Sequence, residues 1–305
     1  MSRHRPFAVT TLAVFAAAVL AAPALAQPSK VGDVATALSL SGLNQFDTDL
    51  DQGGSFRWSG VQAGANVTRQ FTSEFAAGFT LRYDYQHWNF DNPAAFGGFA
   101  PWTNLSTPLI GLNLSYAPTS DWRLGFNPAV DWSGESGANA GDSLSYGAVI
   151  SATKIFSPDL MLGVGAGVFR QIDETKVFPF VVVNWKINER LRLGNPLQAG
   201  PAGGAGLELT WTLADPWEFG AGGSYRSYRF RLKDDGPIPN GIGENRLFPL
   251  FVRLSYAFDS ATRADLYAVA FVGGKLSVTR ADGTDLYSDD YETAPAIALS
   301  LSHRF

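Results

Sequence analysis

The chain contains no cysteine, which excludes a disulfide scaffold, a thiolate metal site and a cysteine nucleophile. Only 17% of its 305 residues are charged, whereas soluble domains carry about a quarter, so the surface is not built for water alone. Beyond the N-terminal region no apolar run is long enough for a spanning helix. The 23 Lys and Arg against 28 Asp and Glu give a net charge of −5, which argues against a nucleic-acid partner.

The N-terminal segment has the features of an export signal. Arg3 and Arg5 form a short basic region, residues 7–22 are mostly apolar, and Pro23 would end a helix. Ala24-Leu25-Ala26 fits the small-x-small pattern of signal peptidase, which predicts cleavage after Ala26. The alternative is an uncleaved anchor, for which the run is short. We therefore divide the chain into a signal peptide, 1–26, and one domain, 27–305.

The rest of the chain alternates with a period of two, which indicates β-strands with one apolar face and one small or polar face. Residues 207–213 show it clearly, since Leu207, Leu209 and Leu213 share a parity opposite to that of Glu208 and Thr210. Fourteen segments follow this rule, of which the first and the ninth are weak: 34–42, 57–70, 75–88, 105–117, 122–132, 143–156, 160–170, 176–187, 190–195, 205–214, 217–232, 246–258, 264–280 and 293–305.

The connections alternate between short and long along the chain. Tight turns fall at 72–74, 118–121, 157–159, 188–189, 214–216 and 259–263, and longer connections fall near 43–54, 89–104, 133–142, 171–175, 196–205, 233–245 and 281–292. That alternation is typical of an antiparallel up-and-down barrel with short turns at one end and long loops at the other. The predicted fold is all-β, a transmembrane barrel of fourteen strands, or twelve if the two weak segments are discounted.

A membrane-spanning barrel explains the two strand faces better than a soluble one. The apolar face suits lipid, and the face rich in Gly, Ser, Thr and charge suits a hydrated interior. Segments of ten to thirteen residues, rising ~3.3 Å each at a tilt of ~40°, cover a hydrocarbon band of ~25 Å. Seven tryptophans lie near strand ends and are expected to form two interfacial girdles: Trp58, Trp88 and Trp132 near long loops, and Trp122, Trp185, Trp211 and Trp217 near short turns.

The C-terminus completes the pattern. Ile297, Leu299 and Leu301 alternate with small residues and lead to a terminal Phe305. Together with the barrel pattern, this end resembles that of the outer-membrane β-barrels of Gram-negative bacteria, of the porin-like kind, over 27–305. The resemblance implies that these four residues are an assembly signal read by the barrel assembly machinery; His303 departs from the usual apolar residue. It also implies an outer-membrane location and contact with lipid and lipopolysaccharide. An even strand count, fourteen or twelve, places both termini at the short-turn end, on the periplasmic side.

The charged residues of the polar faces are the candidate functional residues. By parity they point into the lumen, because an Arg facing lipid at the midplane costs about 2–4 kcal/mol: Arg82, Asp84, Arg123, Asp131, Glu208, Glu218, Arg226 and Arg253. A lumen of mixed charge favours passive passage of ions or small polar solutes. The alternative is a closed structural barrel of the envelope with no transport activity.

One stretch raises the question of catalysis. Tyr85 to Asn89 resembles a motif of the outer-membrane phospholipases, in which a strand-end His precedes the nucleophilic Ser by two residues. Here Asn89 stands in place of that Ser, and a hydrolase would need another Ser beside His87 in space. A lipid-modifying enzyme is therefore the least favoured function, and no catalytic residue, metal or cofactor is expected. The glycine-rich segment 200–206 lacks a following Lys-Ser/Thr, which predicts an outer loop rather than a phosphate site.

Overall fold

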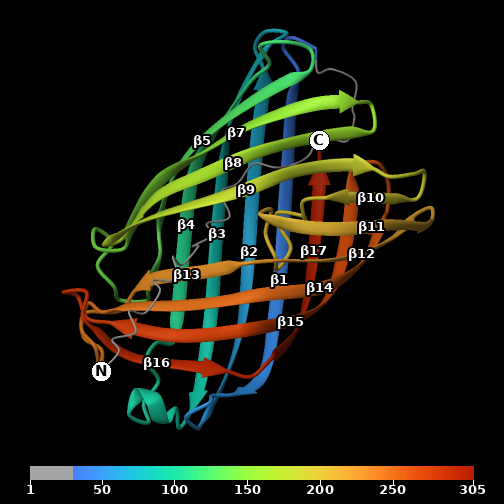
Figure 1. Cartoon of the computed structure of the whole chain (residues 1–305). Coiled ribbons are helices and arrows are strands. Elements are labelled where there is room, and N and C mark those ends of the chain that lie inside the picture. Colours follow the sequence, from blue (N-terminus) through green and yellow to red (C-terminus); the bar gives the residue numbers. More distant parts are fainter. Residues whose placement is uncertain (1–29) are drawn as a thin grey trace, which may run out of the picture.

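The computed structural model describes residues 30–305, which form one antiparallel sheet closed on itself (Figure 1). The predicted signal peptide lies outside these residues. The strands are β1 Val34–Asp49, β2 Ser55–Gln70, β3 Phe75–Asp91, β4 Asn104–Tyr116, β5 Trp122–Trp132, β6 Gly134–Glu135, β7 Leu144–Ser157, β8 Leu160–Gln171, β9 Glu174–Lys186, β10 Leu191–Gly194, β11 Gly206–Ala214, β12 Trp217–Ser224, β13 Arg226–Arg231, β14 Ile242–Ala257, β15 Thr262–Thr279, β16 Asp285–Tyr291 and β17 Ala294–Arg304.

The described part of the chain makes a fourteen-stranded wall. Strands β5 and β6 share the partner β4, β12 and β13 share β14, and β16 and β17 share β15, so each of these pairs is one interrupted strand. The barrel closes where β1 pairs with β17 from Ala37 opposite Arg304 to Gln45 opposite Ala296. The predicted fold class and strand number are confirmed. Among residues 30–305 no helix is long and apolar enough to cross a membrane.

Alternation of side chains produces an apolar outer surface. Leucine, valine and isoleucine side chains of one parity are about half exposed on nearly every strand, for example Leu40 and Leu299 at 58% and Val164 at 65%. Side chains of the other parity are buried against the interior. Because successive strand residues point to opposite faces, a closed ring of such strands has an apolar outside and a packed inside. The exterior is therefore suited to lipid.

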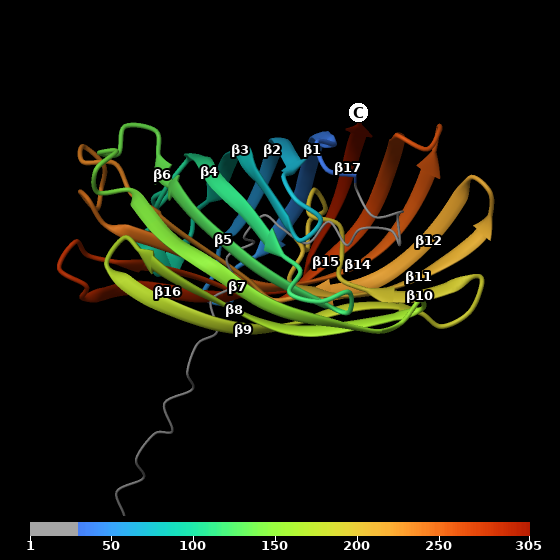
Figure 2. The same ribbon diagram turned by 90° about the horizontal axis from the view of Figure 1, so that it is seen from above.

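The barrel is flattened rather than round. In Figure 1, β1 to β4 run steeply across the view and β8 to β14 cross it at a large angle on the opposite wall. Figure 2 shows the same two walls from above, with the connection between β10 and β11 lying inside the ring of strands. The flattening brings the walls close together, so their inward side chains can fill much of the interior.

Several strands are longer than the sequence predicts. β1 continues to Asp49, and the connection expected at 281–292 is largely β16. The connection expected at 171–175 is a two-residue turn, Ile172-Asp173. Those three predicted loops were too long. The barrel wall thus rises beyond the membrane-spanning length at the long-loop end, where its inner face has room for an apolar cluster.

Candidate functional site: the barrel interior

An aromatic cluster fills the long-loop end of the interior. Trp58, Trp88 and Phe56 stack in parallel, with ring centroids 5.4 and 5.7 Å apart, and Trp102 packs edge-on against Trp88 at 5.6 Å. Trp88 is only 2% exposed. The prediction that Trp58 and Trp88 belong to an interfacial girdle is wrong, because both side chains point inward and lose their water to ring–ring contacts. Trp132, their predicted partner at this end, lies on the outward parity and is half-buried.

The girdle at the short-turn end is present on the outer surface. Trp122, Trp185, Trp211 and Trp217 are 37–50% exposed there. The ammonium of Lys154 lies 5.7 Å from the ring of Trp122, as expected of a long basic side chain at a lipid–water interface.

Glycines on the inner face of β8 leave space in which aromatic rings of the next strand lie flat against the sheet. Gly165 and Gly167 of β8 lie opposite Phe180 and Phe178 of β9. A Cβ on Gly167 would stand 2.1 Å from the Phe178 ring, so no other residue fits without displacing it. The rings of Phe178 and Phe180 therefore fill the space that side chains at Gly167 and Gly165 would occupy.

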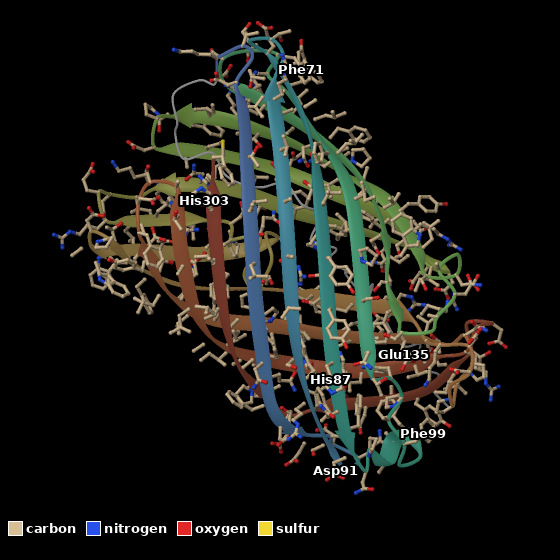
Figure 3. All side chains as sticks on the ribbon, turned by 180° about the vertical axis from the view of Figure 1, so that it is seen from behind. Phe71, His87, Asp91, Phe99, Glu135 and His303 are labelled. Carbon is tan, nitrogen blue, oxygen red and sulfur yellow. The ribbon has the colours of Figure 1, made fainter. Side chains whose placement is uncertain are left out.

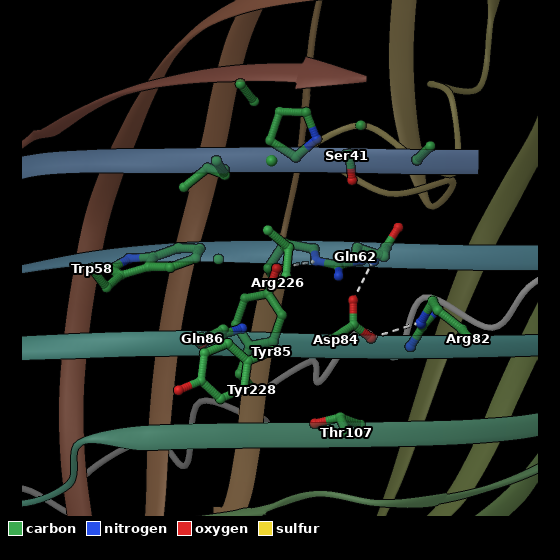
Figure 4. Close-up of a pocket in the computed structure, with 18 of the residues that line it drawn as sticks. Ser41, Trp58, Gln62, Arg82, Asp84, Tyr85, Gln86, Thr107, Arg226 and Tyr228 are labelled. Atoms are coloured by element: carbon green, nitrogen blue, oxygen red, sulfur yellow. Dashed lines mark hydrogen bonds and ion pairs between the residues drawn. The ribbon is translucent and has the colours of Figure 1, made fainter. Parts of the chain in front are cut away.

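A cavity of about 120 Å³, lined by charged and apolar side chains, lies inside the barrel. Four of the predicted lumen residues line it, namely Arg82, Asp84, Asp131 and Arg226. Gln62 donates to Asp84 at 2.5 Å, and Arg82 pairs with the other oxygen of Asp84 at 2.8 Å (Figure 4). A comparable volume in a protein core holds a molecule of benzene size, so the cavity accommodates several waters or a small solute.

Two charged groups of this cavity keep polar atoms without a protein partner among residues 30–305. Asp131 is 1% exposed, and neither of its carboxylate oxygens is hydrogen-bonded. Arg226 donates from Nε to the Tyr228 hydroxyl at 3.1 Å, while its Nη1 is buried and unpartnered. Buried polar atoms rarely lack a partner, so these atoms are directed at whatever fills the cavity.

A second group of predicted lumen residues forms a buried ion network on the opposite wall. Arg253, 1% exposed, bonds through Nε to Glu208 at 2.6 Å and through Nη2 to Glu218 at 2.8 Å. Its Nη1 lies 3.2 Å from Asp265, a residue that the sequence analysis did not single out, and also donates to the Ser255 hydroxyl. Arg263 adds a further contact to Asp265 at 3.3 Å. The network ties β11, β12, β14 and β15 together.

Arg123 is separate from both groups. Its guanidinium donates to the backbone oxygens of Thr119, Ser120 and Trp122 at 2.9–3.3 Å and so braces its own turn. The structure therefore brings seven of the eight predicted residues into two groups.

The segment 195–205 folds into the barrel, where the sequence predicted an outer loop. Ala199, Gly200 and Pro201 line the cavity inside the barrel, and Ala202 belongs to the apolar cluster with 1% exposure. The Ser224 hydroxyl holds the segment by donating to the oxygen of Ala202 at 2.8 Å. The prediction was wrong because β10 has only four residues, which leaves the chain inside the ring when it turns back.

The C-terminal residues of the predicted assembly signal lie on the outer surface. Ile297, Leu299 and Leu301 are 45–58% exposed and Phe305 is 72% exposed. His303 lies against the Phe305 ring at 4.4 Å and shares a 2.8 Å hydrogen bond with Thr262. Their part in assembly stays a prediction. No three His, Asp or Glu side chains within residues 30–305 are grouped to hold a metal ion.

Comparison with known proteins gave structural similarities alone. No family model matches the chain, and no curated protein matches its sequence. A COG4313 outer membrane channel from Pseudomonas putida F1 is 8% identical, with 91% of this chain and 97% of that chain covered and a TM-score of 0.49. The P. putida toluene transporter TodX is 11% identical, with 91% of each chain covered and a TM-score of 0.44. The KdgM porin is 10% identical, with 88% and 99% covered and a TM-score of 0.36.

The closed sheet and its apolar exterior define the class of protein. The chain is a β-barrel of the transmembrane type. The start of β1 and the end of β17 lie together at the short-turn end, where Phe305 donates its backbone N–H to Thr36 at 2.9 Å. In an antiparallel barrel with an even number of strands, the first and last strands always have their free ends at the same end of the barrel.

Proposed function

We propose that the barrel is a narrow passive channel for small polar solutes of the bacterial outer membrane, with both termini in the periplasm. The observation that carries the proposal is the cavity inside the barrel, whose Asp131 and Arg226 present unpartnered polar atoms to its space. A wall that only braced the barrel would pair these groups with each other or with neighbours, because a half-satisfied network weakens the fold. Charges of both signs favour polar solutes over apolar ones.

The segment 195–205 and the aromatic cluster form the constriction of this channel. The segment lies in the lumen beside the cavity, and the cluster stands between the cavity and the long loops. A solute could then cross the barrel only when the segment 195–205 moves aside. Few hydrogen bonds hold this segment in place. Besides the Ser224 hydrogen bond, it is held at its first residue by Asn195, which bonds to the backbones of Val181, Val183 and Gly206.

Single-channel recording in planar bilayers tests the proposal. We expect small ohmic steps from the refolded wild-type barrel. A variant in which residues 197–204 are replaced by two glycines should give larger steps, since the lumen obstruction is removed. Heat-dependent migration on gels checks that both proteins are folded. Silence from both folded proteins would reject a channel.

A closed structural barrel is the second candidate, and the aromatic cluster is the observation that favours it. Twenty-two buried apolar residues form one connected core, which is unusual for a water-filled pore. If the barrel is closed, neither the wild type nor the shortened variant should conduct ions in planar bilayers. Single-channel conductance therefore distinguishes the two candidate functions.

A further inference from the structure

The outer wall carries a row of four polar side chains where lipid-facing residues are expected. Asn44 of β1 pairs with Ser59 of β2, Ser59 pairs with His87 of β3, and His87 pairs with Asn104 of β4. All four have the outward parity of their strands, which they share with exposed apolar residues such as Val61. A hydrolase site at His87 needs a Ser beside it in space, and Ser59 of the neighbouring strand lies in that position.

The imidazole of His87 is oriented by Asn104. Its Nδ1 lies 2.6 Å from Oδ1 of Asn104, which also accepts a hydrogen bond from Tyr85 at 3.0 Å. An amide oxygen can only accept, so Nδ1 is the donor of this bond, and in the neutral imidazole Nε2 then holds the free lone pair. A neutral His in this tautomer is ready to take a proton from a hydroxyl.

Ser59 lies within reach of that base. Directly opposed residues of an antiparallel pair have Cβ atoms about 4.5–5.5 Å apart, which a side-chain rotation converts to a hydrogen bond between hydroxyl and imidazole. The structure has no such bond between Ser59 and His87, and in enzymes without substrate the catalytic bonds are often long. The sequence Ser, His, Asn across three strands thus has the order nucleophile, base and orienting group.

An open groove of about 630 Å³ adjoins Ser59 and His87 on the outer surface. Its remaining walls include Leu266, Ile297 and Leu299, which are 45–58% exposed. An apolar groove facing the hydrocarbon of the membrane is suited to an acyl chain. The ligand expected in this groove is a lipid of the membrane leaflet at the long-loop end of the barrel.

The site lies at the height of the lipid headgroups. Figure 3 shows His87 on the outer side of the wall, much nearer to Asp91 at the long-loop end than to Phe71. Arg57, two residues closer to the loops than Ser59 and of the same parity, is exposed and pairs with Asp47 at 3.4 Å. A guanidinium at that height can hold a phosphate while the ester bond of the lipid lies beside Ser59.

We propose that Ser59, His87 and Asn104 form an acyl-ester hydrolase site for glycerophospholipids of the outer membrane. The Ser59 hydroxyl attacks the ester carbonyl carbon while its proton passes to Nε2 of His87. The acyl carbon–oxygen bond breaks, and His87 returns the proton to the departing alcohol. Water then attacks the carbonyl carbon of the acyl-serine while His87 takes its proton. The bond between that carbon and Oγ of Ser59 breaks, His87 returns the proton to Oγ, and the fatty acid leaves. The activity is independent of solute passage through the lumen.

Asn44 completes the arrangement on the other side of the nucleophile. It is the cross-strand partner of Ser59, and its amide N–H groups can donate to the oxyanion that forms on the carbonyl. Asn44 and His87 therefore flank Ser59 from opposite strands, one for the developing negative charge and one for the proton. Asn104 acts through His87 and is a positioning residue.

Hydrolysis in vesicles tests the site. Protein refolded into phosphatidylethanolamine and phosphatidylglycerol vesicles should release fatty acid, measured by titration of the acid formed. Ser59→Ala and His87→Gln should each lower the rate at least about 100-fold. Thr175→Ala removes an outward hydroxyl from β9 and should leave the rate unchanged. A fluorophosphonate probe should label Ser59, located by mass spectrometry, and His87→Gln should abolish the labelling.

The positioning role of Asn104 has its own readout. Asn104→Asp keeps an oxygen acceptor for Nδ1 and should retain most of the hydrolysis, whereas Asn104→Leu should lose it. Absence of both fatty-acid release and probe labelling in folded wild-type protein overturns the proposal. Wild-type rates in Ser59→Ala overturn it equally. Heat-dependent gel migration of every variant shows that loss of activity is not loss of folding, since all these side chains face outward.

Discussion

Arg253 is the side chain whose removal should most destabilise the barrel. Its guanidinium contacts Glu208, Glu218 and Asp265 at 2.6, 2.8 and 3.2 Å, and two of these carboxylates are at most 3% exposed. In Arg253→Met those two carboxylates stay buried with less compensating charge. Breaking a buried ion pair from one side costs about 3–5 kcal/mol, because the remaining charge is left without its partner.

Urea titration of the barrel in lipid vesicles, followed by tryptophan fluorescence, measures the effect. With an m value of about 2–3 kcal/mol/M, the expected loss lowers the urea midpoint by about 1–2.5 M. Arg190→Met at an exposed turn is the matched control and should change the free energy of unfolding by less than about 0.5 kcal/mol.

A second substitution separates buried charge from lost packing. Arg253→Met combined with Glu208→Gln should be more stable than Arg253→Met alone, because one uncompensated carboxylate is removed. If Arg253→Met lies within about 1 kcal/mol of the wild type, or if the double variant recovers nothing, the reasoning from buried charge is refuted.

Three further predictions concern single positions. Gly167→Val should destabilise the barrel strongly because its side chain would overlap the ring of Phe178, whereas the outward Ala166→Val should be tolerated; urea midpoints compare the two, and equal midpoints would contradict the packing described. Lys154→Ala removes a cation that lies within 6 Å of two aromatic rings and should cost about 0.5–1 kcal/mol in the same titration, no change being the contrary result. The turn residue Asp259 accepts hydrogen bonds from two backbone N–H groups, which lower the pKa of its carboxyl, so its contribution to stability is present above the ordinary pKa of about 3.9 and is lost as pH falls through the lowered value; an NMR titration midpoint at or above 3.9 would disprove this.

The alternation of the sequence was enough to predict the strand number and the faces of most strands. The same parity that placed Arg82 and Asp84 inside also places Trp88 inside. Trp88 was nevertheless predicted to lie in the outer girdle, because its position near the end of a strand was considered and the direction of its side chain was not. Strand length was underestimated at the long-loop end, where inward aromatic residues interrupt the polar face that alternation relies on.

The position of segment 195–205 could not be predicted from the sequence, whereas the row of outward polar residues could. No local pattern in 195–205 distinguishes a loop that turns inward, since its position follows from the shortness of β10 and from contacts with distant residues. The pairing of Ser59 with His87, in contrast, follows from the tight turn after β2. With Gln70 opposite Ala76, every pair of that hairpin is symmetric about residue 73. Counting residues outward from the turn therefore identifies Ser59 as the partner of His87, whereas a search for a Ser within the strand of His87 does not.

The backbone of 195–205 also bears on how such a channel could vary between chains. The residues of this segment that line the cavity are Ala199, Gly200 and Pro201, whose side chains are small, so substitutions at these positions can narrow the cavity but scarcely widen it. Insertion or deletion of residues changes the amount of chain inside the ring in discrete steps. In the proposed channel, the number of residues between β10 and β11 therefore sets how much of the lumen is obstructed, and variation in that number would change the permeability of related chains.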